Sequence, residues 1–147
     1  MEGKHKIVVH IDGGSRGNPG PAAFGVVIKI GNDIKEYGES IGVATNNQAE
    51  YSAAVFALKK VKQLVGKEKA KKTEIEIHLD SELLTRQVNG QYKVLDEKIQ
   101  KLFLEVWNLR LDFAKVTFKH VLREKNQAAD RMVNLALDRE LNGKLAL

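Results

Sequence analysis

Residues 7–21 are Ile7-Val8-Val9-His10-Ile11-Asp12-Gly13-Gly14-Ser15-Arg16-Gly17-Asn18-Pro19-Gly20-Pro21, and the rest of the chain is built around them. The first five are rich in Ile and Val, which predicts a strand buried on both faces, and the glycines and Pro19 predict where it ends. Asp12 is therefore expected where a core strand opens into a loop. A carboxylate there reaches the rim of the core on a rigid backbone, which suits a metal ligand. The alternative is that Asp12 only begins a turn, because Asp-Gly is common turn chemistry.

Length and composition are those of one globular domain. The chain has 147 residues, of which 43% are hydrophobic and 29% charged. No apolar run approaches the roughly 18 residues of a membrane span, so we expect neither a membrane span nor a signal peptide. Because there is no cysteine, a metal would be held by oxygen or imidazole ligands. We expect a cytoplasmic protein without a membrane segment, whose net charge of +5 suits a polyanionic partner.

Hydrophobic periodicity and turn residues predict the order of the elements. An antiparallel meander of three strands comes first, followed by a helix, a strand, two helices, a strand and a last helix. The predicted strands are 7–12, 22–30, 34–41, 74–80 and 116–121. The predicted helices are 45–65, 81–88, 95–109 and 126–139. This division gives one domain at 1–140 and a loosely held tail at 141–147. Right-handed crossovers place the fourth and fifth strands parallel to the first.

Three more carboxylates follow at similar junctions. If the first strand pairs with the fourth, Asp12 and Asp80 lie at the same end of the sheet. The helices that open near Glu50 and Asp130 can bring those two residues to the same place. Each has a structural alternative: Glu50 has capping-box spacing from Asn47, Asp80 can cap the next helix, and Asp130 can complement a helix N-terminus. Four carboxylates in one cleft, however, repel one another and call for a bound cation.

Four segments then suggest a family. They are Asp-Gly-Gly-Ser-Arg-Gly-Asn-Pro-Gly at 12–20, Thr-Asn-Asn-Gln-Ala-Glu-Tyr at 45–51, Asp-Ser-Glu-Leu-Leu at 80–84 and His-Val-Leu-Arg-Glu-Lys-Asn-Gln-Ala-Ala-Asp at 120–130. In these segments the chain resembles the type 1 ribonucleases H, and the resemblance covers nearly its whole length. It implies an α/β, ribonuclease H-like fold with a five-stranded mixed sheet, three antiparallel strands then two parallel, flanked by helices on both faces. It also implies an endonuclease that hydrolyses the RNA strand of RNA–DNA hybrids and leaves 5′-phosphate and 3′-hydroxyl ends.

The resemblance also assigns residues. Those that match the family's metal-binding acidic residues are Asp12, Glu50, Asp80 and Asp130. Four carboxylates and a substrate phosphate suit two Mg²⁺ ions, with Mn²⁺ as a substitute, because these ions prefer oxygen ligands. The residues expected to contact the substrate are Gly13, Gly14, Ser15, Asn18, Thr45, Asn46, Asn47, Gln48 and Ser81. For the amides the alternative is structural: Asn18 closes a turn, and Asn46 or Asn47 caps the helix.

Two departures identify a short-loop form of the family. Arg123-Glu124-Lys125 occupies a short segment where many members carry a histidine in a longer loop. His120 is predicted as a strand residue and not as that histidine. Residues 91–93 are too few and too weakly basic to form the basic protrusion of other members.

Two other functions fit the same residues. A domain with a catalytically silent site would bind hybrid or duplex without cutting it. An exonuclease or resolvase of this fold would share the acidic residues but not the Asn-Pro-Gly and Thr-Asn-Asn segments. We expect a monomer with no obligate protein partner, whose substrate is an RNA–DNA hybrid.

Overall fold

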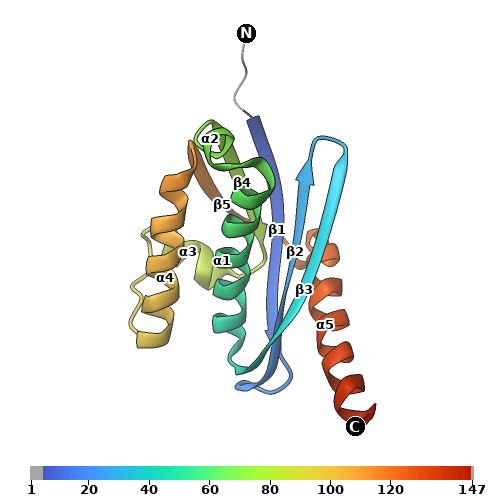
Figure 1. The fold of residues 1–147 in the computed structure, drawn as a ribbon. Coiled ribbons are helices and arrows are strands. Elements are labelled where there is room, and N and C mark those ends of the chain that lie inside the picture. The colour runs from blue at the N-terminus through green and yellow to red at the C-terminus, as the bar shows by residue number, and fades with distance from the viewer. Residues whose placement is uncertain (1–4, 147) are drawn as a thin grey trace.

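A five-stranded mixed sheet forms the centre of the molecule, in the order β3-β2-β1-β4-β5 (Figure 1). The computed structural model describes residues 5–146. The strands are β1 (His5–Ser15), β2 (Gly20–Ile30), β3 (Asp33–Ala44), β4 (Thr73–Leu79) and β5 (Lys115–His120). The first three pair antiparallel, whereas β4 runs parallel to β1 and β5 runs parallel to β4. The predicted α/β class and the arrangement of the strands are confirmed.

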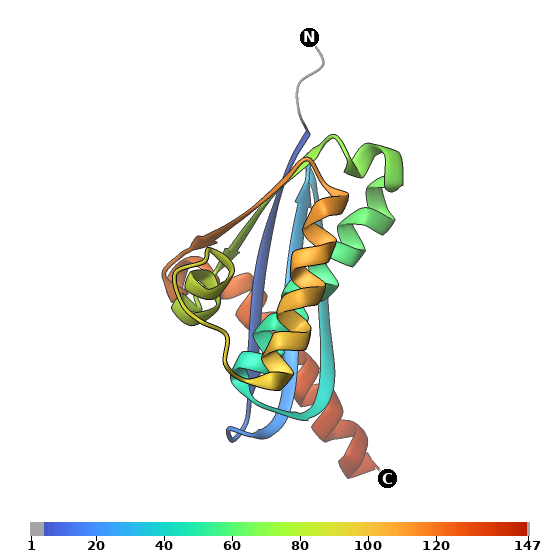
Figure 2. The same cartoon turned by 90° about the vertical axis from the view of Figure 1, so that its left-hand side faces the viewer.

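Helices cover both faces of this sheet (Figures 1 and 2). They are α1 (Asn46–Val65), α2 (Lys67–Ala70), α3 (Glu82–Val88), α4 (Glu97–Leu109) and α5 (Gln127–Ala146). Short 3-10 turns lie at Arg110–Asp112 and Arg123–Lys125. α1 packs on the sheet with α4 beside it, and α5 lies on the opposite face (Figure 2). Over residues 5–146, none of these helices has the length and apolar character needed to cross a membrane.

The two faces of the sheet are not equally buried. In β1, Ile7, Val9 and Ile11 are buried in the core under α1, whereas Val8 and His10 are only half-buried. The prediction that this strand is buried on both faces is therefore wrong. The physical reason is that α5 packs mainly on β2 and β3 and meets β1 near Gly14, so that part of the second face has no helix over it.

β1 also extends beyond its predicted end at Asp12. It pairs with β2 as far as Ser15, so Gly13 and Gly14 lie inside the strand. Glycine is required at position 13 because a Cβ atom there would collide with the backbone of Ala49 and Glu50 in α1. Gly13 therefore allows a close approach of β1 and α1, and Asp12 is held by a sheet ladder and not by a turn.

The last helix is longer than predicted. It was expected to end near Arg139, but α5 continues to Ala146, so the predicted boundary is wrong and residues 141–146 are helical. Residues 140–146 hold no proline, and the one glycine, Gly143, lowers helix propensity without ending the helix. Leu147 lies outside the described residues.

Candidate active site

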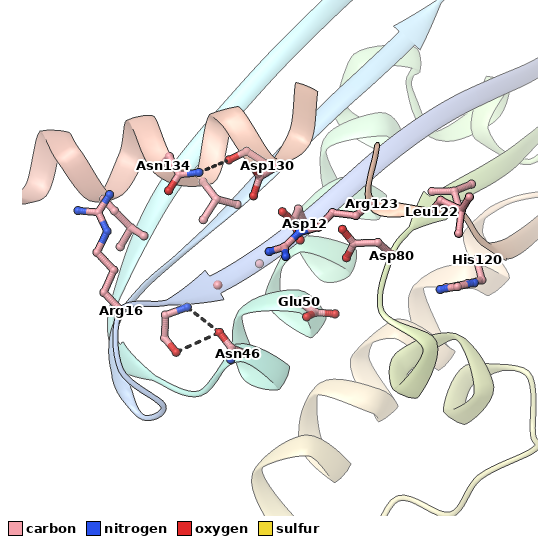
Figure 3. Close-up of a pocket in the computed structure, with 16 residues that line it drawn as sticks. Asp12, Arg16, Asn46, Glu50, Asp80, His120, Leu122, Arg123, Asp130 and Asn134 are labelled. Atoms are coloured by element: carbon pink, nitrogen blue, oxygen red, sulfur yellow. Dashed lines mark hydrogen bonds between the residues drawn. The ribbon is translucent and has the colours of Figure 1, made fainter. Parts of the chain in front are cut away.

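A pocket of about 500 Å³ opens where β1, β4, α1 and α5 meet. Four carboxylates line it, and each comes from a different part of the chain: Asp12, Glu50, Asp80 and Asp130. Figure 3 shows these side chains around the same space, with Glu50 on α1 and Asp130 on α5 at its edges. The structure thus brings together the four acidic residues that the sequence singled out.

The register of the sheet places the first pair. β1 and β4 run parallel, with His10 opposite His78. Asp12 and Asp80 each come two residues later, so they lie at the same end of the sheet. The Asp12 side chain points to the face of the sheet opposite Ile11, because successive residues of a strand alternate faces, and Asp80 comes directly after the end of β4. Asp80 does not cap α3, since the Ser81 hydroxyl accepts the hydrogen bond from the Leu84 amide at 3.1 Å.

The N-terminus of α1 is held by a capping box in which Glu50 takes no part. The Thr45 side chain accepts from the Gln48 amide at 3.1 Å, and the Gln48 side chain accepts from the Thr45 amide at 2.8 Å. The alternatives in which Asn46 or Asn47 caps this helix, or Glu50 completes the box, are therefore wrong. The close contact of Gly13 with the start of α1 then brings Glu50 to the end of β1.

Asn126 positions α5 and was not identified from the sequence. It is 1% exposed, and its Nδ2 donates to the Ile11 carbonyl oxygen at 2.8 Å. Its own carbonyl accepts from the Asp130 amide at 3.2 Å, so the first turn of α5 is tied to β1 beside Asp12. In the sequence this residue only marks a helix start. Its burial depends on where the connection from β5 crosses the sheet, which no local pattern reveals.

The crowding of carboxylates disfavours their charged forms. Burial raises the pKa of Asp12 to about 8, and the charges of Asp80 and Glu50 add to the rise. Burial also raises the pKa of Glu50 to about 7, against a hydrogen bond from Ser81 that lowers it. The pKa of Asp80 is raised by burial and by Asp130, while Arg123 opposes that rise. Such a set of buried carboxylates becomes fully ionised near neutral pH only if positive charge is supplied.

Further residues of the pocket were not among the predicted site residues. Arg123 and Leu122 line it from the segment between β5 and α5, and His120 lines it from the end of β5. In Figure 3 the Arg123 side chain extends toward Asp12 and Asp80. His120 is a strand residue, as predicted. Arg16 lines the opposite wall and forms an ion pair with Asp138 of α5 at 2.7 Å.

The predicted substrate-contact residues fall into two groups. Those that line the carboxylate pocket are Gly13, Gly14, Ser15 and Asn46. The amide and hydroxyl of Ser15 both donate to Asn46 Oδ1, at 2.8 and 3.1 Å (Figure 3). Those that line a second cavity, between Pro19 and the start of α4, are Thr45, Asn47 and Gln48.

Asn18 and Ser81 line neither cavity within the described residues. Asn18 Oδ1 accepts from the Asn46 amide at 3.0 Å, so this residue joins the loop after β1 to the start of α1. Ser81 is the N-cap of α3 and also hydrogen-bonds Glu50. Both residues therefore hold parts of the site in place.

The donor set suits a hard divalent cation. All four carboxylates offer oxygen ligands, which such a cation prefers. The pKa values of Asp12 and Glu50 are raised, so a cation would favour their charged forms. Asp12 and Asp130 are also in hydrogen-bond contact. Across residues 5–146, no three acidic or histidine side chains are grouped closely enough to enclose an ion as they stand. Mg²⁺ is usually held by one or two carboxylates together with waters and substrate phosphates, so an ion here would take its remaining ligands from water and the substrate.

Comparison with known proteins agrees with this geometry. A family model described as reverse transcriptase-like matches residues 10–136. The bifunctional protein Rv2228c of Mycobacterium tuberculosis is 36% identical over 136 residues, which are 90% of this chain and 36% of that protein. The chain thus spans about a third of the length of this curated relative.

Two solved structures are similar over almost their full length. RNase H1 of the halophilic archaeon Halobacterium salinarum is 37% identical, with a TM-score of 0.83, and the match covers 91% of this chain and 98% of that one. LC11-RNase H1, isolated from compost and solved in complex with an RNA/DNA hybrid, is 38% identical with a TM-score of 0.86, over 92% and 99% of the two chains. The chain therefore belongs to the reverse transcriptase-like family and carries a ribonuclease H-like domain.

Proposed function

We propose that this protein is a ribonuclease H, an endonuclease that hydrolyses the RNA strand of RNA–DNA hybrids. The observation that carries the proposal is the convergence of Asp12, Glu50, Asp80 and Asp130 on one open pocket. The hybrid bound by LC11-RNase H1, whose chain matches this one at 38% identity, supports the choice of substrate. We expect the domain to act as a monomer.

The four carboxylates would hold two Mg²⁺ ions, or Mn²⁺ in their place. When bound, such ions lower the pKa of an attacking water and neutralise charge on the leaving oxygen. The water oxygen then forms a bond to phosphorus while the bond to the 3′-oxygen breaks. The leaving oxygen takes up a proton, so the products carry 5′-phosphate and 3′-hydroxyl ends.

The rest of the pocket would orient the substrate. Arg123 offers a guanidinium to the phosphate beside Asp80, where it also limits the rise in the pKa of that carboxyl. Ser15 and Asn46, joined by their two hydrogen bonds, present a polar wall at the opposite side. Recognition of RNA requires contact with a 2′-hydroxyl, which both donates and accepts hydrogen bonds. The backbone of residues 13–15 and the Glu50 carboxylate are suited to that contact.

Strand-specific labelling tests the proposal. Hybrids carrying the label on the RNA or on the DNA strand are incubated with Mg²⁺, alongside duplex DNA and duplex RNA. We expect internal cuts in the RNA strand of the hybrid and an intact DNA strand, with a phosphate on the 5′ end of each new fragment.

The same assay separates the two other functions. A silent binding module would retain the hybrid in a gel-shift experiment and leave every strand intact. A DNA nuclease of this fold would cut duplex DNA at least as well as the hybrid. Either result would overturn the proposal.

A further inference from the structure

A basic cavity, distinct from the two described above, lies on the part of the sheet that α5 leaves open. It has a volume of about 620 Å³ and is formed over β1 and β4. Its basic side chains are Lys6, Lys29, Lys125, His10 and His78. Neither aspartate nor glutamate lines it within the described residues. The charge of this lining is therefore opposite to that of the carboxylate pocket.

Part of the positive charge around this cavity is uncompensated. Lys6 forms an ion pair with Glu76 at 2.8 Å, and His78 contacts the same carboxylate at 2.6 Å. Over residues 5–146, the side-chain ammonium groups of Lys29 and Lys125 have neither an ion-pair nor a hydrogen-bond partner. Lys29 is close enough to His10 to lower the pKa of that imidazole, after the larger effect of burial. Lys29 therefore places positive charge near His10, and Lys125 adds positive charge to the lining of the same cavity.

The hydrogen bonds of Asn126 determine which nitrogen of His10 is left for a ligand. Because Asn126 Nδ2 donates to the Ile11 carbonyl, its Oδ1 faces His10 Nδ1 as an acceptor, at 3.2 Å. Nδ1 must then carry the proton that is donated, and Nε2 is the remaining nitrogen. The His78 ring packs edge-on against this imidazole with centroids 4.8 Å apart. Both rings are thus fixed by partners outside the cavity.

The charge around the cavity selects the ligand. A metal cation could use a free imidazole nitrogen, but three lysines would repel it. An anion is attracted by the lysines, and a phosphate group that still carries a proton can donate it in a hydrogen bond to His10 Nε2. We propose that this cavity is a binding site for a phosphate group, held by Lys29, Lys125 and His10.

The site would be a neighbour of the carboxylate pocket and separate from it. Val121 lines both cavities, Leu122 and Arg123 line the carboxylate pocket, and Lys125 lines the basic one. The proposal does not rest on the proposed function, because binding needs neither metal nor cleavage. The phosphate can come from free inorganic phosphate or from the terminal phosphate of an oligonucleotide, and the test distinguishes these sources.

The test follows the histidine ring signals by NMR in metal-free protein near neutral pH. Inorganic phosphate is titrated in one arm, and in two others a short 5′-phosphorylated oligodeoxynucleotide and its unphosphorylated counterpart. We expect saturable shifts at His10 and His78 and a smaller response at His120, which reports on the carboxylate pocket. The double variant Lys29→Glu/Lys125→Glu should bind about tenfold more weakly or not at all.

A matched variant controls for net charge. Lys35→Glu/Lys101→Glu makes the same charge change at exposed positions on β3 and α4, and should bind like the wild type. Shifts with inorganic phosphate alone identify a small-anion site, and shifts that need the 5′-phosphate of the oligonucleotide identify a strand end. No saturable shift in any arm, or equal loss of binding in both double variants, would overturn the proposal.

Discussion

Asp12 and Glu50 are carboxyl groups whose surroundings oppose their charge. Burial is the main cause for both, and it raises the pKa of Asp12 to about 8 and that of Glu50 to about 7. A carboxyl with a raised pKa binds its proton more tightly in the folded than in the unfolded protein. Its contribution to stability is therefore complete below the unfolded pKa near 4, and is lost as the pH rises through the folded pKa.

The first prediction concerns the metal-free protein. We expect its melting temperature to fall between pH 5 and pH 8, and to fall less in Asp12→Asn, which removes one of these ionisations. At pH 8 the variant should melt about 3 °C or more above the wild type, since 1 kcal/mol corresponds to about 2–4 °C at this chain length. Mg²⁺ should raise the melting temperature of the wild type far more than that of the variant.

Asp33→Asn is the control, because it makes the same carboxyl-to-amide change at the exposed first residue of β3. It should follow the wild type at every pH and with Mg²⁺. A melting temperature of the wild type that rises from pH 5 to pH 8 without metal would contradict the account of the site.

At the residue scale, the acidic residues could be identified from the sequence, but the residues that position them could not. Asp12 and Asp80 could be predicted because each comes directly after an apolar run, and the parallel pairing of β1 and β4 brings them together. Asn126 and Arg123 could not, because their place depends on how the segment after β5 crosses the sheet. Thr45 was not recognised as the N-cap because several consecutive polar residues all suit that position.

Among the elements, α5 is positioned by a glycine of β2. A Cβ atom on Gly25 would collide with the Ala129 carbonyl oxygen and approach Met132 in the first turns of the helix. We expect Gly25→Ala to cost about 1–3 kcal/mol in the free energy of unfolding, and to reduce cleavage by moving Asp130 away from Asp12. Urea denaturation and a hybrid-cleavage assay measure the two effects.

Gly14→Ala is the matched control for stability. Its added Cβ would lie 3.6 Å from Val133 Cγ1, an ordinary contact, so we expect a change within about 0.5 kcal/mol. Equal stability of both variants would show that the contact between β2 and α5 is looser than described.

A second prediction at this scale concerns the end of α5. Gly143 lies within the helix, and a Cβ atom there would meet nothing within 4 Å. Gly143→Ala should therefore stabilise the protein by about 0.5 kcal/mol in urea denaturation, because alanine has the higher helix propensity. Gly66→Ala should destabilise it, since Gly66 has a φ of +89°. An unchanged stability in Gly143→Ala would favour the loose tail that the sequence suggested.

The element boundaries show where a local pattern stops being informative. The alternation in β4 and the end of α1 at Val65 were predicted correctly, because burial on one face repeats at the period of the element. The extension of β1 to Ser15 was not, since Gly13 and Gly14 usually end a strand. Here they remain in it because α1 packs directly against the backbone of Gly13 and α5 lies over Gly14, tertiary contacts that local propensity does not contain.

At the scale of the whole molecule, one sheet presents two pockets of opposite charge. The carboxylate pocket lies where α1 and α5 converge on the ends of β1 and β4, and the basic cavity lies over the open part of the same strands. The segment between β5 and α5 contributes residues to both. This arrangement places the proposed cation site and the proposed phosphate site on the same strands.

The central claim is that the four carboxylates perform metal-dependent cleavage of RNA in a hybrid. Single-turnover cleavage of an end-labelled RNA–DNA hybrid tests it most directly, with wild type and Asp12→Asn compared in Mg²⁺ and in EDTA, and hybrid affinity measured in parallel. We predict internal RNA cutting by the wild type in Mg²⁺ only, and a loss of at least about 100-fold in the variant while binding persists. Equal cleavage by Asp12→Asn, or cleavage by the wild type in EDTA, would contradict the claim.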